Sequence, residues 1–182
     1  PEEDIYITID QHYSYNQEIN DIIVDDETFV VPKSGKYKIE MHGGGGCGGL
    51  AIKSYNSSRK YNGGDGGGSG EVFLITLSKK DIYNVIIGKG GTRQEKSTST
   101  QFGNLIVEGG GNGTDAWHTA KGEYYEGTNG ASVGSLAQGR SGGTENGYGD
   151  GGSGGYYDIK GENIKGFNGS PGAIFITYLG EN

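Results

Sequence analysis

Met41-His42-Gly43-Gly44-Gly45-Gly46-Cys47-Gly48-Gly49 is the stretch of sequence that decides the fold. It follows residues 36–41, in which apolar and polar side chains alternate as in a half-buried strand. Near-continuous glycine cannot extend that strand or begin a stable helix, because glycine loses the most backbone entropy on ordering. One ordered structure does use glycine in quantity, namely the polyproline-II helix of three residues per turn, when several such helices pack side by side. The stretch therefore predicts packed helices of this type.

Glycines recur at a spacing of three, which would align them along one face of a three-residue helix. In the first stretch, one row is Gly43, Gly46 and Gly49, and a second is Gly45 and Gly48. Gly44 and Cys47 form the third face, which we expect to be able to carry a side chain. Further rows of the same spacing are Gly64, Gly67 and Gly70; Gly149, Gly152 and Gly155; and Gly166, Gly169 and Gly172.

The composition favours one ordered domain with a thin core. The chain has 182 residues, of which 31% are hydrophobic. Its 39 glycines are about three times the usual share, and its 3 prolines are too few for collagen. A flexible linker would also be rich in glycine. The strong apolar strands and 13 tyrosines favour order instead.

The charge and cysteine content exclude several classes of function. A net charge of −8 argues against general binding to nucleic acid or to an anionic membrane, which require basic patches. The single cysteine, Cys47, cannot form an intrachain disulfide or a cysteine zinc site. We recognise no membrane-spanning run and no signal peptide. Because the chain begins with Pro1, we expect it to be a fragment of something longer.

Strands are predicted on both sides of the glycine region, and no stretch predicts a helix. The expected strands are 5–9, 19–24, 27–31, 36–41, 71–77, 82–87, 101–108 and 173–179. We expect residues 71–77 and 82–87 to pair as a hairpin through 78–81, and residues 101–108 to form one strand broken by Gly103. The first strands and the last strand must meet in space, with the glycine region looped out between them.

Several short motifs, taken in order, resemble the glycine-rich domain of bacteriophage tail fibres over roughly residues 24–180. They are Phe29-Val30-Val31-Pro32, Gly35-x-Tyr37, Gly70 before a hydrophobic strand, Val85-Ile86-Ile87-Gly88-x-Gly90-Gly91, Phe102-Gly103, Gly109-Gly110-Gly111 and the closing stretch from Gly169-Ser170-Pro171-Gly172-Ala173-Ile174 to Tyr178. The glycine-rich region of anaplastic lymphoma kinase is similar in principle, but its cysteine-rich setting is absent here.

The resemblance implies an all-β fold: a small antiparallel β-sandwich that frames a bundle of packed polyproline-II-like (polyglycine-II) helices, with essentially no α-helix. It assigns residues 24–182 to this domain. Residues 1–23, an acidic opening that the family pattern does not explain, become an N-terminal strand or connector from a longer fibre protein.

Related adhesins at the tips of T-even phage tail fibres bind bacterial surface receptors through variable loops between glycine motifs. The resemblance therefore implies an adhesin on a virion tail fibre or on an extracellular phage-tail-like particle. Its partners would be a bacterial surface protein or polysaccharide and the rest of the tail fibre. A homotrimer formed through the fibre is left open, and no nucleic acid or membrane insertion is implied.

Two motifs suggest a cofactor or metal, and we expect neither. Gly43-x-Gly45-x-x-Gly48 matches the dinucleotide fingerprint, but that site needs a helix at the glycines, and residues 50–62 have no apolar helical stripe. Residues 63–66 and 149–151 suggest calcium-binding nonapeptide repeats, whose fixed register is absent.

Catalytic signals are also weak. His12, His42 and His118 stand in unrelated contexts, and Cys47 has no readable base unless the fold brings a histidine to it. A hydrolase acting on surface polysaccharide would need a carboxylate pair at catalytic separation, which the sequence does not supply. We therefore expect no enzyme and name no catalytic residues.

Aromatic side chains gather in three varied inserts between glycine motifs, residues 50–62, 114–126 and 156–165. A glycine bundle has little interior space for rings, so surface rings would suit sugar stacking or a protein hot spot, although capping the glycine layer would also account for them. The candidate receptor-binding residues are Tyr55, Tyr61, Trp117, His118, Tyr124, Tyr125, Tyr156 and Tyr157. The alternative, a structural or surface-coating glycine protein, would present flat and repetitive faces rather than varied aromatic inserts.

Overall fold

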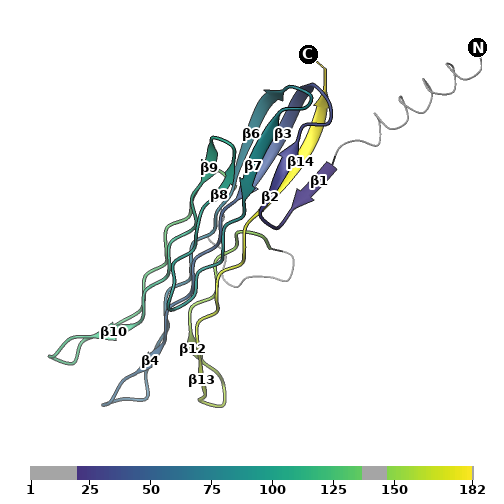
Figure 1. Cartoon of the computed structure of the whole chain (residues 1–182). Helices are drawn as coiled ribbons and strands as arrows, with labels where there is room; N and C mark the ends of the chain where they lie inside the picture. Colours follow the sequence, from purple (N-terminus) through teal and green to yellow (C-terminus); the bar gives the residue numbers. More distant parts are fainter. Residues whose placement is uncertain (1–19, 137–146, 182) are drawn as a thin grey trace, which may run out of the picture.

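The computed structural model describes residues 20–136 and 147–181, and over these ranges the chain is all-β, without a helix. One end is built from two four-stranded antiparallel sheets (Figure 1). The first sheet has the order β1 (Asn20–Ile23), β14 (Ala173–Gly180), β3 (Gly35–His42) and β6 (Glu71–Leu77). The second has the order β2 (Glu27–Val30), β7 (Ile82–Ile86), β8 (Thr100–Phe102) and β9 (Leu105–Val107).

Strand β3 follows its sequence pattern. Tyr37, Ile39 and Met41 are buried, while the residues between them are more exposed. The last strand, β14, lies between β1 and β3, and Ile174 and Ile176 face Met41 and Ile39 in the register. The prediction that the first strands and the last strand meet is therefore confirmed. Asn20–Ile23 was assigned, with the rest of residues 1–23, to an N-terminal strand or connector outside the domain, but it is part of this sheet.

The two sheets share one hydrophobic core, which gives the end of the molecule a sandwich-like form. The first sheet contributes Tyr37, Ile39 and Met41, and the second contributes Phe29 and Phe102, whose ring centroids are 5.6 Å apart. Burying each such side chain stabilises the fold by about 1.5–3 kcal/mol.

Two predictions about strand pairing are wrong. Strands β6 and β7 do not pair with each other, because β6 pairs with β3 whereas β7 pairs with β2 and β8. The connection 78–81 crosses between the sheets and is bonded to the end of β2: Val31 N–H donates to Asp81 O, and Lys80 N–H donates to Val31 O, both at 2.8 Å.

Residues 101–108 are likewise two strands rather than one. Strands β8 and β9 pair with each other through a tight turn, so that Thr100 faces Val107. The turn requires the left-handed φ of +56° at Gly103, which glycine adopts without a steric penalty. The expected strand 5–9 lies outside the described residues.

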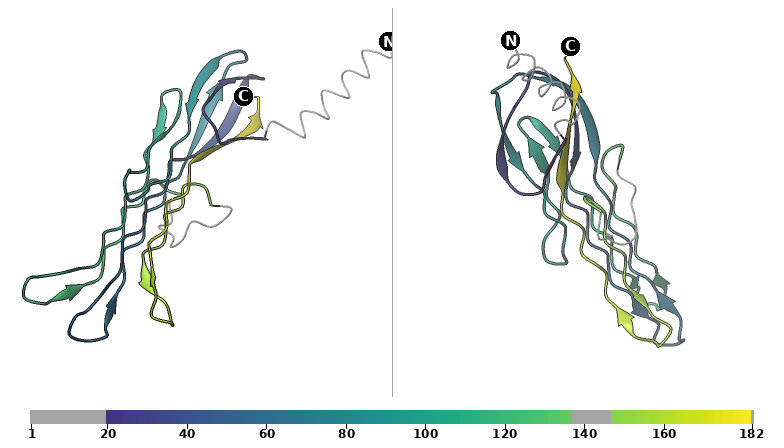
Figure 2. Two further views of the ribbon diagram at one scale, coloured as in Figure 1. Left: turned by 60° about the horizontal axis from the view of Figure 1, so that its bottom comes forward. Right: turned by 90° about the vertical axis from the view of Figure 1, so that its right-hand side faces the viewer.

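Three long glycine-rich excursions of the chain run away from the sheets, and each reverses in a short hairpin at the far end (Figure 1). A shorter excursion, residues 87–99, connects β7 to β8 and is bonded to segment 43–50 through Gly91 and Thr98. The long excursions consist of glycine-rich pieces, which we call the glycine segments: 43–50, 62–70, 108–116, 126–133, 147–155 and 165–172. Figure 2 shows from two further sides that these segments run alongside one another.

Backbone hydrogen bonds join the glycine segments with a period of three. Gly46 and Gly49 donate N–H groups to Gly67 and Gly64 of segment 62–70, at 2.9 and 2.8 Å. Gly45 and Gly48 donate instead to Ser170 and Phe167 of segment 165–172, at 2.8 and 2.9 Å. These two directions correspond to the first two glycine rows of the sequence.

Segment 43–50 is the hub of this network. Its carbonyl groups at Gly44, Cys47 and Leu50 accept from segment 108–116, and those at Gly46 and Gly49 accept from segment 147–155. It is therefore bonded to every other glycine segment except 126–133, which is bonded to segments 62–70 and 108–116. Backbone groups that an extended segment cannot satisfy internally are satisfied by neighbouring segments.

Close approach of backbones leaves no room for side chains at most of these positions. A Cβ atom added at Gly46 or Gly152 would lie 1.9 Å from the carbonyl oxygen of a neighbouring segment. The third face of segment 43–50 was expected to tolerate side chains, and at Gly44 this is wrong, because an added Cβ would lie 1.8 Å from Lys89 O. The reason is that neighbours surround this segment. On this face Cys47 has a buried side chain, and Leu50, at the end of the segment, has a partly exposed one.

We predict that Gly152→Ala destabilises the domain by about 3 kcal/mol or more, because the new methyl group must displace the backbone at Phe167. The measurement is denaturant unfolding of the purified domain. The matched control is Gly122→Ala: Gly122 has a φ of +85° but no atom within 4 Å of an added Cβ, so backbone conformation alone should cost about 1 kcal/mol. Equal losses of stability in the two variants would contradict close packing at Gly152.

Candidate binding surface at the hairpin end

Three two-stranded hairpins form the end of the molecule farthest from the two sheets (Figure 1). They are β4 (Ile52–Lys53) with β5 (Lys60–Tyr61), β10 (Trp117–His118) with β11 (Tyr124–Tyr125), and β12 (Tyr156–Tyr157) with β13 (Asn163–Ile164). We call them the first, second and third hairpins. Strand β1 and the C-terminal end of β14 lie at the opposite end. The three inserts thus emerge together at one end of the glycine segments.

The second and third hairpins use the same turn, Thr119-Ala-Lys-Gly-Glu123 and Asp158-Ile-Lys-Gly-Glu162. In each turn the first residue donates its N–H to the carbonyl of the Glu, at 2.8 and 2.9 Å, and its side-chain oxygen accepts the N–H of that Glu. The glycine has a left-handed φ, +85° in one turn and +82° in the other. The repeated Lys-Gly-Glu is a sequence signal from which these two turns could have been predicted.

Aromatic rings of the first hairpin pack against those of the second. Tyr61 of β5 stacks on Tyr124 of β11 with ring centroids 5.3 Å apart and an interplanar angle of 19°. The Tyr55 N–H donates to the Tyr124 hydroxyl at 3.1 Å, and the Tyr55 ring meets His118 edge-on at 6.0 Å. Of the predicted site residues, Tyr55, Tyr61, His118 and Tyr124 therefore form one cluster between two hairpins.

Trp117 and Tyr125 form a separate aromatic pair. They face each other in the register of β10 and β11, and their rings stack with centroids 4.5 Å apart. Because side chains alternate along a strand, this pair lies on the opposite face of the second hairpin from His118 and Tyr124. Trp117 remains 50% exposed and Tyr125 40% exposed, so the stack presents apolar surface to solvent.

The third hairpin carries the last two predicted residues. Tyr157 approaches the first hairpin, where the Lys60 ammonium lies 5.8 Å from the centre of its ring. Tyr156 is exposed and faces Ile164 across the hairpin. All eight predicted residues thus lie at the hairpin end, although they divide between two faces and do not form one continuous patch. Sequence reasoning did not single out Arg59, Lys60 or the fully exposed Ile159.

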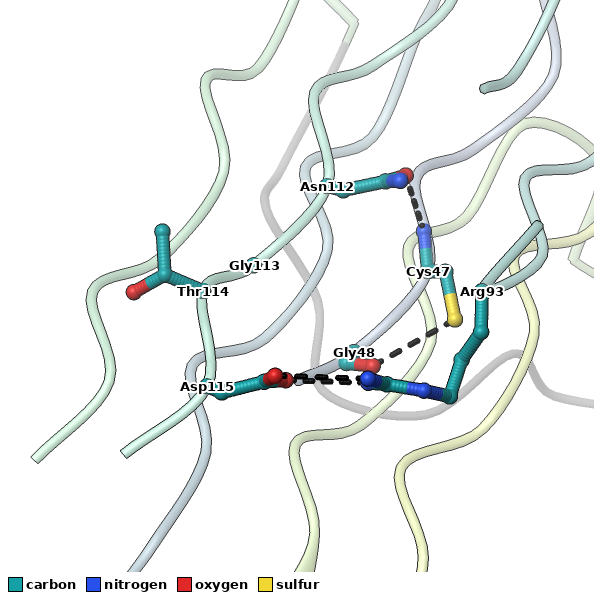
Figure 3. A pocket seen from close by; sticks show the side chains of 7 residues that line it. All are labelled: Cys47, Gly48, Arg93, Asn112, Gly113, Thr114 and Asp115. Atoms are coloured by element: carbon teal, nitrogen blue, oxygen red, sulfur yellow. Dashed lines mark hydrogen bonds and ion pairs between the residues drawn. The ribbon is translucent and has the colours of Figure 1, made fainter. Parts of the chain in front are cut away.

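A pocket of about 230 Å³ lies beside segment 43–50, on the flank of the glycine region (Figure 3). Its lining residues are Cys47, Gly48, Arg93, Asn112, Gly113, Thr114 and Asp115. Arg93 donates to both carboxylate oxygens of Asp115, at 2.9 and 3.3 Å. Together with the N–H of Leu50, this bond holds the pKa of Asp115 below its usual value. The one cation of the pocket is thus already paired.

Cys47 in this pocket lacks the surroundings of a catalytic thiol. Burial raises the pKa of the thiol, which keeps it protonated and a poor nucleophile at neutral pH. Its Sγ lies 3.3 Å from Gly48 O, and the ring nitrogens of His42 contact Glu40 and Ser69 O instead, both at 2.7 Å. Over the described ranges, no group of three or more His, Cys, Asp and Glu could hold a metal ion.

No family model matches the chain, and no curated protein matches it. Within residues 20–136 and 147–181, no helix is long and apolar enough to cross a membrane.

We predict that the Cys47 thiol of the folded protein reacts with iodoacetamide at pH 8 about 100-fold more slowly than in denaturant. The physical reason is that Cys47 is 2% exposed and becomes accessible only when the glycine segments separate. Labelling followed by mass spectrometry measures both rates. Similar rates in the folded and unfolded protein would show that the segments open freely.

Proposed function

We propose that this chain is the receptor-binding domain at the distal end of a phage or phage-tail-like tail fibre, and that its hairpin end binds a protein or glycan of the bacterial surface without catalysing a reaction. One observation carries the proposal: three hairpins with exposed aromatic rings are held together at the end farthest from β1 and the C-terminal end of β14. In a fibre attached through its sheet end, the hairpins would face outward.

We further propose that the glycine segments form a bundle of polyglycine-II helices. In a β-strand, backbone groups point alternately to two sides. Here the three consecutive residues Gly44, Gly45 and Gly46 donate to three different neighbours, Thr98, Ser170 and Gly67. Bonds in three directions with a period of three are what a helix with three residues per turn requires.

A bundle of this kind suits recognition because it fixes the hairpins before a partner arrives. Less conformational entropy is then lost on binding. The stacked pair of Trp117 and Tyr125 has the composition of a binding hot spot, since large rings bury apolar area with few rotatable bonds. Glu123, which accepts a hydrogen bond from the Tyr125 hydroxyl at 2.7 Å, and the exposed Lys121 add polar groups beside the pair.

We predict that Trp117→Ala and Tyr125→Ala each weaken binding to host cells by about 30-fold, equivalent to about 2 kcal/mol, and leave the melting temperature almost unchanged. The measurement is titration of fluorescently labelled domain onto whole cells of a panel of bacterial strains. Both residues are exposed, so neither is needed for the core.

The matched control is Leu74→Ala, which removes an apolar side chain that is 71% exposed at the sheet end. This variant should bind like the parent domain. If a strain binds the parent, and both hairpin variants bind it equally well, the Trp117 and Tyr125 pair is not the receptor site. A domain that binds no strain in a broad panel would favour a purely structural glycine protein.

A further inference from the structure

We propose that the first hairpin, together with Tyr157 of the third, is a binding site for an acidic saccharide that carries carboxylate or phosphate groups. This inference depends on the proposed receptor-binding function and specifies the chemistry of one ligand. We call the site the basic hairpin surface, and define it by Lys53, Tyr55, Arg59, Lys60, Tyr61 and Tyr157. It covers both faces of the first hairpin, because side chains alternate along β5: Tyr61 contacts the second hairpin, whereas Lys60 contacts Tyr157 of the third.

Positive charge is concentrated on this surface in an otherwise acidic chain. The first insert, 50–62, has three basic residues and no acidic one. The second, 114–126, has one basic and three acidic residues, and the third, 156–165, has two of each. The three inserts together have a net charge of +1, whereas the whole chain has −8. An anionic ligand is therefore repelled by most of the molecule and attracted to the first hairpin.

Among the described residues, the cations of the first hairpin have no carboxylate partners. The ion pairs over the described residues are Arg93 with Asp115 and His42 with Glu40, so none involves Lys53, Arg59 or Lys60. Lys53 also lies directly opposite Lys60 in the register of β4 and β5. Like charges in this position destabilise a hairpin, and a bound anion would relieve the repulsion.

Three acidic side chains of the inserts accept hydrogen bonds within the protein. The Glu126 carboxylate accepts the N–H of Asn62, where the first hairpin ends. Glu123 accepts the Tyr125 hydroxyl on the far face of the second hairpin. Asp158 caps the turn of the third hairpin by accepting two backbone N–H groups, from Lys160 and Glu162. These acids keep their charge, but among the described residues none of them forms an ion pair with Lys53, Arg59 or Lys60.

Aromatic rings alternate with the cations. The Arg59 guanidinium lies 5.4 Å from the ring centre of Tyr61, and the Lys60 ammonium lies 5.8 Å from that of Tyr157. These cation–π contacts orient the charged groups without neutralising them. Tyr55 is 85% exposed, yet its backbone is fixed by the Tyr124 hydroxyl and its ring by the edge contact with His118.

This combination fits a saccharide better than a protein. A sugar ring can pack its apolar face on the exposed ring of Tyr55 with an acidic group paired to Arg59, and an acidic group of another sugar unit of the same polymer can pair with Lys60 on the other face of the hairpin. The loop between the strands offers Asn56, Ser57 and Ser58, all exposed, to sugar hydroxyls. A protein partner would instead need a wider apolar core, and the larger apolar pair, Trp117 with Tyr125, lies on the other face of the second hairpin.

The test measures binding of the purified domain to immobilised polygalacturonate, which carries carboxylates, to phosphomannan, which carries phosphates, and to neutral dextran. We expect binding to at least one acidic polymer, weakening as salt is raised, and none to dextran. The double variant R59Q/K60Q should lose binding by at least about 10-fold. The matched control K160Q/K165Q removes the same charge from the third insert, 156–165, and should stay within about 2-fold of the parent. Thermal unfolding of both variants checks that they remain folded.

Binding to polygalacturonate alone, to phosphomannan alone or to both supports the inference and identifies the acidic group. No binding to either polymer overturns it, and so does an equal loss in the two double variants. Cell binding separates this inference from the proposed function. If R59Q/K60Q binds host cells as the parent does, and acidic polymers do not compete, the saccharide site is wrong while receptor binding stands. If the domain binds acidic polymers but no cells, the receptor proposal fails on its own.

Discussion

Close contact between glycine backbones is the constraint on which the rest of this structure depends. Segment 43–50 can donate to and accept from its neighbours only because those neighbours approach without intervening Cβ atoms. Extended chains have no internal hydrogen bonds, so each buried N–H and C=O group must find its partner in another segment. The glycine segments are consequently expected to form and unfold cooperatively. The hydrophobic core of the two sheets lies at only one end of these segments.

This constraint also explains why the hairpins are so different from the glycine segments. Where the glycines stop, side chains return, and the chain needs turns and stacked rings to hold its shape. The Tyr61–Tyr124 stack and the repeated Lys-Gly-Glu turn supply that order locally. Side chains beyond these contacts, such as Trp117 and Ile159, can change without disturbing the segments beneath them. Under the proposed function, this division would let the receptor specificity vary while the fold stays constant.

Much of the fold could be predicted from the sequence because its signals are periodic. The alternation in residues 36–41 predicts β3, and glycines at a spacing of three predict the directions of the bonds from Gly45 and Gly46. The positions of the aromatic inserts predict the hairpin end. The crossing at residues 78–81 could not be predicted, because it depends on Val31, which is distant in sequence.

Other features of the site follow from spatial neighbours that no local pattern specifies. Nothing in the sequence around Gly44 distinguishes it from a residue whose side chain could point to solvent. It is enclosed because other segments surround segment 43–50 on every side. Similarly, the pairing of Tyr61 with Tyr124 requires two excursions of the chain to end side by side. In contrast, the two similar turns could have been predicted, because the Lys-Gly-Glu repeat is visible in the sequence.

Hydrogen exchange at single-residue resolution tests the central claim most directly. If the glycine segments are bonded as described, the amides of Gly45, Gly46, Gly48 and Gly49 should exchange as slowly as those of Ile39 and Met41 in β3. Exposed hairpin amides such as those of Ser58 and Ala120 should exchange fast. Glycine amides that exchange at the rate of an unstructured peptide, while β3 stays protected, would contradict the account.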